Sequence, residues 1–385
     1  MTKNICVIGA GFSGATVARE LARAGCEVDV WDSRPHIAGN CYTEVDPATG
    51  ILLHVYGPHI FHTKDSDVWA YVNQFASFSP FFNRVKAHRY GTVFSLPVNL
   101  HTINQLFSTA LGPAEARVYL RHRAVTYDRE PRSFEEQALS MLGPEIYEAF
   151  FKHYTEKQWG VSPADLPASI LKRLPVRFDY DDRYYSDPHQ GIPKEGYTAL
   201  VQRMLSGPGI NVSLGRKFVA GRDDLTKYAH VFYTGPLDEY FDFRWGRLEY
   251  RSLAFEKETV EGDYQGNPVI NYCGPEVPWT RITEHKHFMD ADVRPAEASV
   301  IFREFSYATG KDDVPFYPLR LVDDKKLLGL YQAAVQREAG VTFLGRLATY
   351  RYIDMDLAIR EALDVAAAYL AAVHEGREVP KSRIE

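Results

Sequence analysis

The first thirty residues alternate between strand-like and helix-like hydrophobic patterns. Residues 5–8 are apolar throughout, which is typical of a short buried strand. Apolar residues then recur at helical spacing through residue 24, Gly25 ends this segment, and residues 28–31 resume a strand-like alternation. This order predicts a strand, a helix and a second strand, as at the start of a parallel sheet.

Three glycines, Gly9, Gly11 and Gly14, lie between the first strand and the helix in the pattern Gly-x-Gly-x-x-Gly. In this pattern the first glycine permits a tight turn, the second lets the backbone approach a pyrophosphate, and the third lets the helix pack closely on the strand. Asp32 ends the second strand, where its carboxylate can accept hydrogen bonds from ribose hydroxyls. Because all these parts occur in order, the sequence predicts a dinucleotide-binding unit rather than an accidental glycine-rich turn.

The residues after Asp32 favour FAD over NAD as the dinucleotide. Arg34 and the turn-like Ala38-Gly39-Asn40 extend the nucleotide fingerprint, as flavoproteins do to follow a longer cofactor. A second Gly-x-Gly-x-x-Gly for a nicotinamide is missing from the sequence. This pattern suggests a flavin that acts on one bound substrate.

Further along the chain, the opening pattern is interrupted and then returns. Residues 100–171 are mostly helical in pattern, whereas residues 93–96 and 300–302 suggest strands of a separate sheet. A last helix is expected to begin with Asp356 as its cap and to end at Gly376. Strand-like segments of the first type return at residues 211–219, 230–234 and 341–346. The predicted fold class is α/β, a discontinuous Rossmann-like FAD-binding domain with a helical insertion domain and an antiparallel sheet domain.

We expect the chain to divide into three domains and a tail. The FAD-binding domain comprises residues 1–80, 190–242 and 320–375. The helical substrate domain, with a mobile loop, comprises residues 99–175. The sheet domain comprises residues 81–98, 176–189 and 243–319, and the tail comprises residues 376–385.

Composition narrows the class of ligand. The chain of 385 residues carries a formal net charge of −6, so no general positive field would attract nucleic acid or an anionic membrane. Its apolar stretches are too short to span a membrane, and its four cysteines lack the spacing of a metal site. We expect a cytoplasmic protein without disulfides, a nucleic-acid partner or a membrane span, in which local arginines bind a small anionic ligand.

Two histidines, His59 and His62, stand three residues apart in the segment YGPHIFHT. In a helix this spacing would suggest a metal site, but Pro58 and the neighbouring turn residues argue against a helix. We therefore predict no metal. Contact with a flavin and a hydrogen-bonded core histidine both remain open for these residues.

Residues 150–173 combine aromatic side chains with an arginine. Aromatic faces can stack on a pyrimidine base, and the guanidinium of Arg173 can donate a forked pair of hydrogen bonds to a diphosphate. The alternative is a hydrophobic helix face with a surface arginine, and the residues alone favour that alternative. The aromatic candidates around Thr155 are Phe150, Phe151, Tyr154 and Trp159.

Taken together, segments along almost the whole chain resemble the bacterial, FAD-dependent UDP-galactopyranose mutases. The resemblance departs from the family pattern at Ala38, where relatives usually have glycine. The segments that carry it are VIGAGFSG, YGPHIFHT, NRVKA with FSLPVNLHTINQ, YTEKQWG, KRLPVRF, QGIPKEGYT, GDYQGNPVINY, TRITEHKHF, PFYPLR and GRLATYRYIDMD.

The resemblance implies an isomerase that interconverts UDP-galactopyranose and UDP-galactofuranose for galactofuranose-containing cell-surface glycans. It implies that FAD must be reduced, that the flavin N5 acts as the nucleophile on the anomeric carbon, and that UDP leaves and later returns. An external reductant such as NAD(P)H and a homodimer are expected on the same ground.

The resemblance also assigns roles to residues. It implies Arg173, Arg281 and His62 as catalytic residues, with both arginines on the diphosphate and His62 against the isoalloxazine. The expected substrate-binding residues are Asn83, Phe150, Phe151, Tyr154, Thr155, Trp159, Arg173, Tyr184, Asn271, Arg281, Tyr317 and Tyr352. The expected cofactor-binding residues are Gly9, Gly11, Phe12, Ser13, Gly14, Asp32, Ser33, Arg34, Gly39, Asn40, His59, Ile60, Val219, Arg346, Tyr352, Asp354 and Met355.

Two other functions compete with the mutase. An FAD oxidoreductase that takes hydride from an amine or an alcohol would use the same N-terminal fingerprint. A flavoprotein that binds or senses a nucleotide sugar without turnover would bind UDP-sugars tightly and leave them unchanged. The aromatic and arginine cluster favours the mutase over the oxidoreductase.

Overall fold

The strand, helix and strand at the N-terminus form β1 (Asn4–Ile8), α1 (Phe12–Arg23) and β2 (Glu27–Trp31). The computed structural model describes residues 3–173, 176–319, 324–379 and 381, without the side chains of residues 172–173 and 324–325. Residues 1–2, 174–175, 320–323, 380 and 382–385, which the domain prediction also covers, lie outside the described residues.

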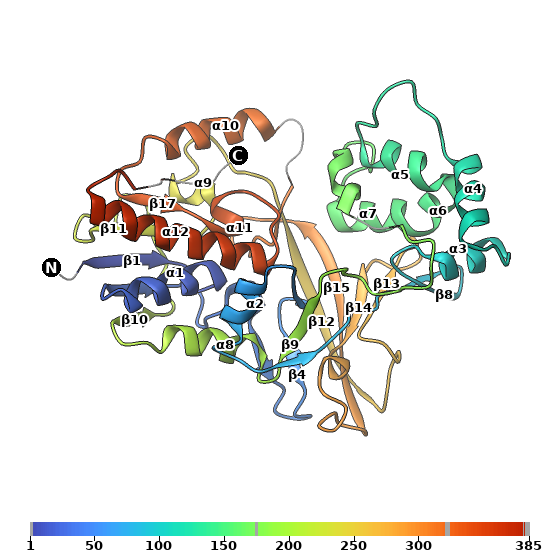
Figure 1. The fold of residues 1–385 in the computed structure, drawn as a ribbon, viewed down its shortest axis with the longest axis horizontal. Helices are drawn as coiled ribbons and strands as arrows, with labels where there is room; N and C mark the ends of the chain where they lie inside the picture. Colours follow the sequence, from blue (N-terminus) through green and yellow to red (C-terminus); the bar gives the residue numbers. More distant parts are fainter. Residues whose placement is uncertain (1–2, 174–175, 320–323, 380, 382–385) are drawn as a thin grey trace.

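β1 and β2 belong to a five-stranded parallel sheet with helices on both faces (Figure 1). Successive side chains of a strand point to opposite faces. Ile5 and Val7 therefore face a core shared with α1, α8 (Gly196–Leu205) and α12 (Met355–Glu375), whereas Cys6 and Ile8 face α9 (Leu237–Tyr240) and α10 (Asp324–Val335). The strand order is β10 (Ile210–Ser213), β2, β1, β11 (His230–Tyr233) and β17 (Val341–Phe343).

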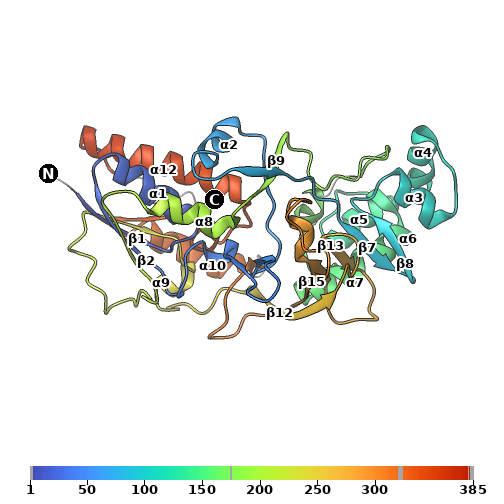
Figure 2. The same cartoon turned by 90° about the horizontal axis from the view of Figure 1, so that it is seen from below.

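A second sheet of seven strands lies between the parallel sheet and a helical part (Figures 1 and 2). Its two longest strands pair antiparallel over 11 residues. The order is β16 (Tyr317–Pro318), β12 (Tyr250–Glu261), β15 (Ala298–Ala308), β14 (Arg281–Glu284), β13 (Val269–Tyr272), β7 (Lys86–Arg89) and β8 (Thr92–Ser95).

The helical part follows β8 in the chain and packs on one side of the second sheet (Figure 1). It contains a π-helical turn at Tyr147–Phe151, a geometry that is rare and frequent at functional sites. Its helices are α3 (Leu100–Phe107), α4 (Pro113–Arg123), α5 (Phe134–Leu142), α6 (Pro144–Ile146), α7 (Lys152–Trp159) and a 3₁₀ helix at Ala168–Arg173.

Small elements connect the larger units. They are 3₁₀ helices at Gly39–Cys41 and His285–Phe288, the two-stranded sheet β3 (Thr43–Val45) and β4 (Leu52–His54), the three-stranded sheet β5 (Phe61–Thr63), β9 (His189–Pro193) and β6 (Phe78–Pro80), and the helices α2 (Ser66–Val72) and α11 (Gly345–Ala348). Among the described residues, no helix is long and apolar enough to cross a membrane.

The predicted fold class is confirmed, with two differences in detail. β13 and β7 pair in parallel, so the second sheet is not wholly antiparallel; the long chain between them imposes no hairpin and therefore no antiparallel direction. The expected cap Asp356 is wrong. Asp354 has extended backbone angles and immediately precedes α12, whereas Asp356 already lies within the helix.

Candidate active site

Of the three glycines in the turn after β1, only Gly11 has room for a Cβ atom. A Cβ at Gly9 would lie 1.9 Å from the Thr234 Oγ1, and one at Gly14 would lie 1.9 Å from the Gly9 carbonyl oxygen. A Cβ at Gly11 would have only the Gly39 Cα, at 3.9 Å, within 4 Å among the described residues. Gly9 and Gly14 therefore serve packing, while Gly11 and Gly39 border a space that a backbone-bound ligand can enter.

The N-terminus of α1 points its backbone donors toward this space. Gly11 is the N-cap of the helix and, as a glycine, has no side chain to accept a hydrogen bond from the first N–H groups. The first N–H groups of a helix lack partners within the helix and carry a partial positive charge. Phe12 and Ser13 thus begin an anion site suited to a pyrophosphate.

Asp32 is fixed at the carboxyl end of β2. It is 8% exposed, and its two carboxylate oxygens accept hydrogen bonds from the Ala10 N–H at 2.8 Å and the Arg34 N–H at 2.9 Å. The Arg34 guanidinium donates to the Asn40 Oδ1 at 2.7 Å and lies over the Tyr56 ring. The segment after β2 is therefore held against the glycine turn and can follow a long dinucleotide.

The other predicted cofactor residues have diverse environments. Ser33 is exposed, Ile60 is buried in a small core cluster, and Val219 is 37% exposed with its N–H bonded to the Asp223 carboxylate. Arg346 donates to the Ile353 carbonyl at 2.7 Å, and its guanidinium lies 5.0 Å from the centre of the Tyr352 ring.

His59 and His62 lie in and beside β5 and not on a helix. The His59 Nδ1 lies 2.9 Å from the Gly57 carbonyl, and burial, with the positive charge of Arg346, lowers the pKa of His59 to about 4. His59 is therefore neutral and donates its Nδ1 proton to the backbone.

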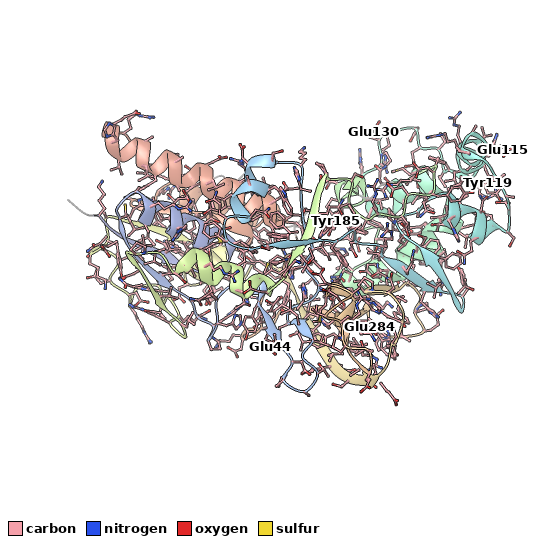
Figure 3. All side chains as sticks on the ribbon, turned by 60° about the horizontal axis from the view of Figure 1, so that its bottom comes forward. Glu44, Glu115, Tyr119, Glu130, Tyr185 and Glu284 are labelled. Atoms are coloured by element: carbon pink, nitrogen blue, oxygen red, sulfur yellow. The ribbon has the colours of Figure 1, made fainter. Side chains whose placement is uncertain are left out.

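The ring of His62 is held between two residues of one segment. Its Nδ1 lies 2.6 Å from the Asp187 carboxylate, and the Tyr185 ring stacks on it with centroids 3.6 Å apart. Tyr185 lies in the middle of the molecule, between the parallel sheet and the helical part (Figure 3). Since a carboxylate only accepts, the Nδ1 carries the proton, which leaves Nε2 as an acceptor in the neutral ring.

Arg281 and Asn271 share one face of the second sheet. Asn271 pairs in register with Arg281, and Arg281 pairs with Glu304. The Arg281 guanidinium donates to the Glu304 carboxylate at 2.7 Å, and Glu304 is 1% exposed. Burial lowers the pKa of Arg281, but Glu304, Tyr154 and Tyr317 raise it by more than burial lowers it. The pKa of Arg281 therefore lies well above its usual value, and the side chain is permanently cationic.

Several phenols gather around Arg281. The Tyr317 and Tyr352 rings stack with centroids 5.6 Å apart, and the Tyr317 ring also contacts Trp159 of α7. Burial raises the pKa values of Tyr184 and Tyr317 to about 12, and it raises that of Tyr154 further. These hydroxyls therefore stay protonated and can donate hydrogen bonds to an anion.

Two amide oxygens in the same region lack partners. The Oδ1 atoms of Asn83 and Asn271 are buried and have no hydrogen-bond partner within the described part of the chain. Buried polar atoms are rarely left unsatisfied. These two acceptors therefore fit a ligand that carries hydroxyl groups.

The predicted base-stacking residues differ in their availability. Phe150 is 2% exposed and packs its ring edge against Phe94 in the core of the helical part, and Thr155 is buried. Phe151, Tyr154 and Trp159 are partly exposed. The side chain of Arg173 lies outside the described residues.

Known proteins resemble this chain over nearly its whole length. A family model described as UDP-galactopyranose mutase matches residues 149–352, and one described as an NAD(P)-binding Rossmann-like domain matches residues 7–75. A Klebsiella pneumoniae protein named a probable UDP-galactopyranose mutase is 51% identical over 378 residues, which cover 98% of this chain and 97% of that protein. The chain belongs to the UDP-galactopyranose mutase family.

Members of related specificity and known structure are also similar. An Escherichia coli dTDP-fucopyranose mutase is 48% identical, with 95% of this chain and 98% of that protein covered. A crystal structure of a reduced UDP-galactopyranose mutase has the same fold, with a TM-score of 0.77, 16% identity, and coverage of 97% and 96%. The family that the sequence motifs indicated is therefore confirmed.

Within this family fold, the sequence patterns missed three partners of the site residues. Glu304 accepts a hydrogen bond from Arg281, Asp187 lies within hydrogen-bond distance of His62, and Tyr185 stacks on the His62 ring. An acidic residue in a strand-like segment, next to Arg303, is a weak signal for Glu304. Asp187 and Tyr185 carried no signal, because their contacts depend on how β9 approaches β5.

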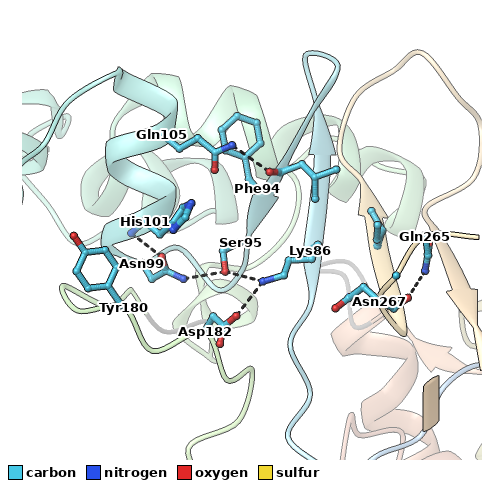
Figure 4. Close-up of a pocket in the computed structure, with 13 residues that line it drawn as sticks. Lys86, Phe94, Ser95, Asn99, His101, Gln105, Tyr180, Asp182, Gln265 and Asn267 are labelled. Atoms are coloured by element: carbon cyan, nitrogen blue, oxygen red, sulfur yellow. Dashed lines mark hydrogen bonds and ion pairs between the residues drawn. The ribbon is translucent and has the colours of Figure 1, made fainter. Parts of the chain in front are cut away.

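A groove of about 660 Å³ lies on the opposite face of the second sheet from Arg281 (Figure 4). Its residues Lys86 and Ile270 pair in register one step before Ala87 and Asn271, so their side chains point to the other face. Lys86 donates to Asp182 at 3.0 Å, which partly satisfies its charge. We assign neither the nucleotide nor the sugar to this groove.

Proposed function

We propose that this protein interconverts UDP-galactopyranose and UDP-galactofuranose while holding reduced FAD. The observation that carries the proposal is the Asn271 and Arg281 face, where a permanent cation, protonated phenols and an unpartnered amide oxygen converge. This combination suits a sugar attached to a diphosphate.

FAD fits the residues present at the glycine turn. The space between Gly11 and Gly39, the free donors of α1 and the Asp32 carboxylate suit a pyrophosphate and a ribose. Reduced FAD, when bound, supplies a nucleophile toward the anomeric carbon of the sugar. Arg346 and the N-terminus of α12 after Asp354 would favour negative charge on the cofactor, because both present positive charge.

Arg281 acts on the leaving nucleotide. As the bond between the sugar and the diphosphate breaks, negative charge grows on the diphosphate, and a fixed guanidinium stabilises that charge without reorganising. One such donor contributes about 3 kcal/mol to transition-state stabilisation. Tyr317 and Tyr184 donate hydrogen bonds to the same anion, and we propose that Arg173 adds a second cation.

The sugar hydroxyls are placed by acceptors. The Oδ1 atoms of Asn83 and Asn271 accept from hydroxyl groups, which relieves their burial without partners. The Nδ1 of His62 is taken by Asp187, so its Nε2 can accept a hydrogen bond from the ligand. Phe151, Tyr154 and Trp159 provide the partly exposed aromatic faces for the pyrimidine.

A second candidate substrate pair is dTDP-fucopyranose and its furanose form. It is favoured by the relative of that name, whose identity of 48% is close to the 51% of the probable UDP-galactopyranose mutase. Both substrates place a diphosphate against Arg281, so the same residues would act in either reaction.

The test is turnover by reduced and oxidised protein. Dithionite-reduced protein is incubated with UDP-galactofuranose, and in parallel with dTDP-fucofuranose, and the products are separated by chromatography. We expect the reduced protein to form UDP-galactopyranose and the oxidised protein to form none. Equal activity with oxidised flavin, or no product from either sugar, would reject the mutase, and faster turnover of the dTDP-sugar would select the second candidate.

Other parts of the proposal rest on the family resemblance. We propose a cytoplasmic homodimer that receives electrons from an external reductant such as NAD(P)H and serves galactofuranose-containing cell-surface glycans. We also propose the division into FAD-binding, helical and sheet domains with the boundaries given above. Size-exclusion chromatography with light scattering would test the dimer, and anaerobic reduction by NAD(P)H followed by flavin absorbance would test the reductant.

A further inference from the structure

Lys157 lies on α7, the helix that also carries Tyr154, Thr155 and Trp159. Its side chain is half-buried, and its ammonium makes no ion pair shorter than 4.0 Å with a carboxylate of the described residues. The ammonium instead donates to four backbone carbonyl oxygens of one short segment. They belong to Tyr272 at 2.7 Å, Gly274 at 2.8 Å, Val277 at 3.2 Å and Trp279 at 2.9 Å.

This segment, residues 272–279, joins the two strands that bear the proposed diphosphate site. It follows Asn271 on β13 and precedes Arg281 on β14. At its end, the Thr280 hydroxyl donates to the Glu304 carboxylate, which in turn accepts from Arg281. The position of the segment therefore affects both Asn271 and Arg281.

The segment depends on a cation for its shape. Four carbonyl dipoles that converge on one point repel one another, and an ammonium with three N–H donors offsets that repulsion. Residues 273–280 contain two prolines and form no regular helix or strand. Arg89 also lies beside this segment, but its guanidinium pairs with the Glu276 carboxylate, whereas Lys157 donates to the four carbonyl oxygens.

The last turn of α7 is also fixed to the second sheet from the other side. The Gln158 carbonyl accepts from the Arg251 Nε at 3.2 Å and from the Ser306 hydroxyl at 2.6 Å. α7 is thereby attached to β12 and β15 through Gln158, and to the β13–β14 segment through Lys157. These two attachments therefore connect α7, which is proposed to bind the nucleoside, to the strands that carry the proposed diphosphate site.

We propose that Lys157 is a positioning residue that sets the spacing between the nucleoside-binding helix α7 and Arg281. The inference rests on the proposed function, because it assumes that α7 and Arg281 bind two parts of one nucleotide. Lys157 itself touches no substrate in this account. Its loss should weaken nucleotide binding more than it slows the chemical step.

The surroundings of Lys157 make this role dependent on pH. Burial lowers the pKa of Lys157 to about 8, while Cys273 and Glu276 raise it and Arg89 lowers it. As pH rises through this value, the ammonium loses its charge and holds the four carbonyls less strongly. Nucleotide affinity should therefore decrease as pH rises from 7.0 to 8.5.

The experiment measures UDP affinity of the oxidised, FAD-loaded protein by calorimetry at pH 7.0 and pH 8.5. This range lies above the second pKa of a phosphate, about 6, so the charge of UDP changes little. If the neutral lysine binds about tenfold less well, a pKa near 8 makes the wild-type affinity fall about threefold across the range. Lys157→Met should weaken affinity about tenfold at pH 7.0, the equivalent of one charge-assisted hydrogen bond, and abolish the pH effect.

Two further variants and a kinetic measurement complete the design. Lys157→Arg should retain most of the affinity at both pH values, because its pKa stays far above this range. Lys152→Met is the matched control on the same helix, since Lys152 pairs with Glu148 on the surface, and its affinity should stay within about twofold of wild type. In the reduced enzyme, Lys157→Met should raise KM while kcat changes by less than about threefold.

Unchanged UDP affinity in Lys157→Met would overturn the proposal, and wild-type affinity that does not vary between the two pH values would overturn its dependence on pH. If Lys157→Met does not fold, the affinity of Lys157→Arg at the two pH values still tests the role of the positive charge. Measuring UDP binding separately from turnover distinguishes the mutase proposal from the role of Lys157. No sugar isomerisation by wild-type protein that binds UDP normally would reject the mutase. Unchanged UDP affinity in Lys157→Met, with normal isomerisation by the wild type, would reject the role of Lys157.

Discussion

Replacing Arg281 with methionine should affect activity and stability by separate amounts. Methionine keeps an apolar stem of similar length and removes the guanidinium that donates to Glu304 at 2.7 Å. The activity loss comes from the missing cation beside the leaving diphosphate. The stability loss comes from the Glu304 carboxylate, which stays in a site that is 1% exposed without its counter-charge.

Both magnitudes follow from this geometry. Loss of one preorganised donor to a developing anion costs about 3 kcal/mol, or about a hundredfold in kcat/KM. An uncompensated charge left in a buried pair costs about 3–5 kcal/mol of folding free energy. A second substitution, Glu304→Gln, removes the stranded charge, so the double variant should regain most of the stability and none of the activity.

The assay combines thermal unfolding with steady-state kinetics of the reduced protein on UDP-galactofuranose. We expect a lower Tm for Arg281→Met, a Tm near wild type for Arg281→Met/Glu304→Gln, and kcat/KM reduced about a hundredfold in both. Flavin absorbance serves as the control that each variant retains its cofactor. Recovery of activity together with stability in the double variant would show that Arg281 is structural and would refute its assignment to the diphosphate.

Four further substitutions test the glycine turn, the partner of His62 and a buried carboxylate of the second sheet. Gly14→Ala should unfold at a lower temperature because its Cβ would lie 1.9 Å from a carbonyl oxygen, whereas Gly11→Ala should keep the Tm of the FAD-free protein and lose flavin content measured by absorbance; equal effects on both properties would contradict the open position at Gly11. Asp187→Asn should lower kcat at least about tenfold and change the ¹⁵N shifts of His62, because the carboxylate fixes the ring tautomer; unchanged shifts would remove that role. Burial raises the pKa of Glu284, but its hydrogen bonds lower it by more, so the pKa falls from 4.5 to about 2 on folding. The stability that the ionised carboxylate contributes is therefore present above pH 4.5 and is lost as pH falls toward 2. In Glu284→Gln, the free energy of unfolding measured by urea titration should depend less on pH in this range. An acid limb that is equally steep in the variant would argue against this source.

The parts of the fold that the sequence predicted depend on local chemistry. Gly9, Gly11 and Gly14 lie within six consecutive residues and shape a single turn. Asp32 directly follows a strand that can be recognised from five residues. The cofactor turn can therefore be located from these residues alone. The helical middle is visible for the same reason, because helices are built from contacts close in sequence.

The parts that it did not predict depend on register and on distant segments. The pairing of Arg281 with Glu304 requires β14 and β15 to align in one register, and the residues of the two strands do not by themselves specify that register. Lys157 appears in the sequence as an ordinary helical lysine, and its four carbonyl partners lie more than a hundred residues away. Asp356 looked like a helix cap by residue type, but the backbone turns into the helix two residues earlier.

In the proposed reaction, the site breaks the bond between the sugar and the diphosphate and keeps both the sugar and the nucleotide bound. UDP-galactopyranose labelled with ¹⁸O at the bridging oxygen tests this most directly, with the label position read from ³¹P NMR during turnover. Reduced protein should move the label from the bridging to the non-bridging positions of the β-phosphate. Reduced Arg281→Met should move the label about a hundredfold more slowly. Galactofuranose product formed with the label still entirely in the bridging position would contradict the account.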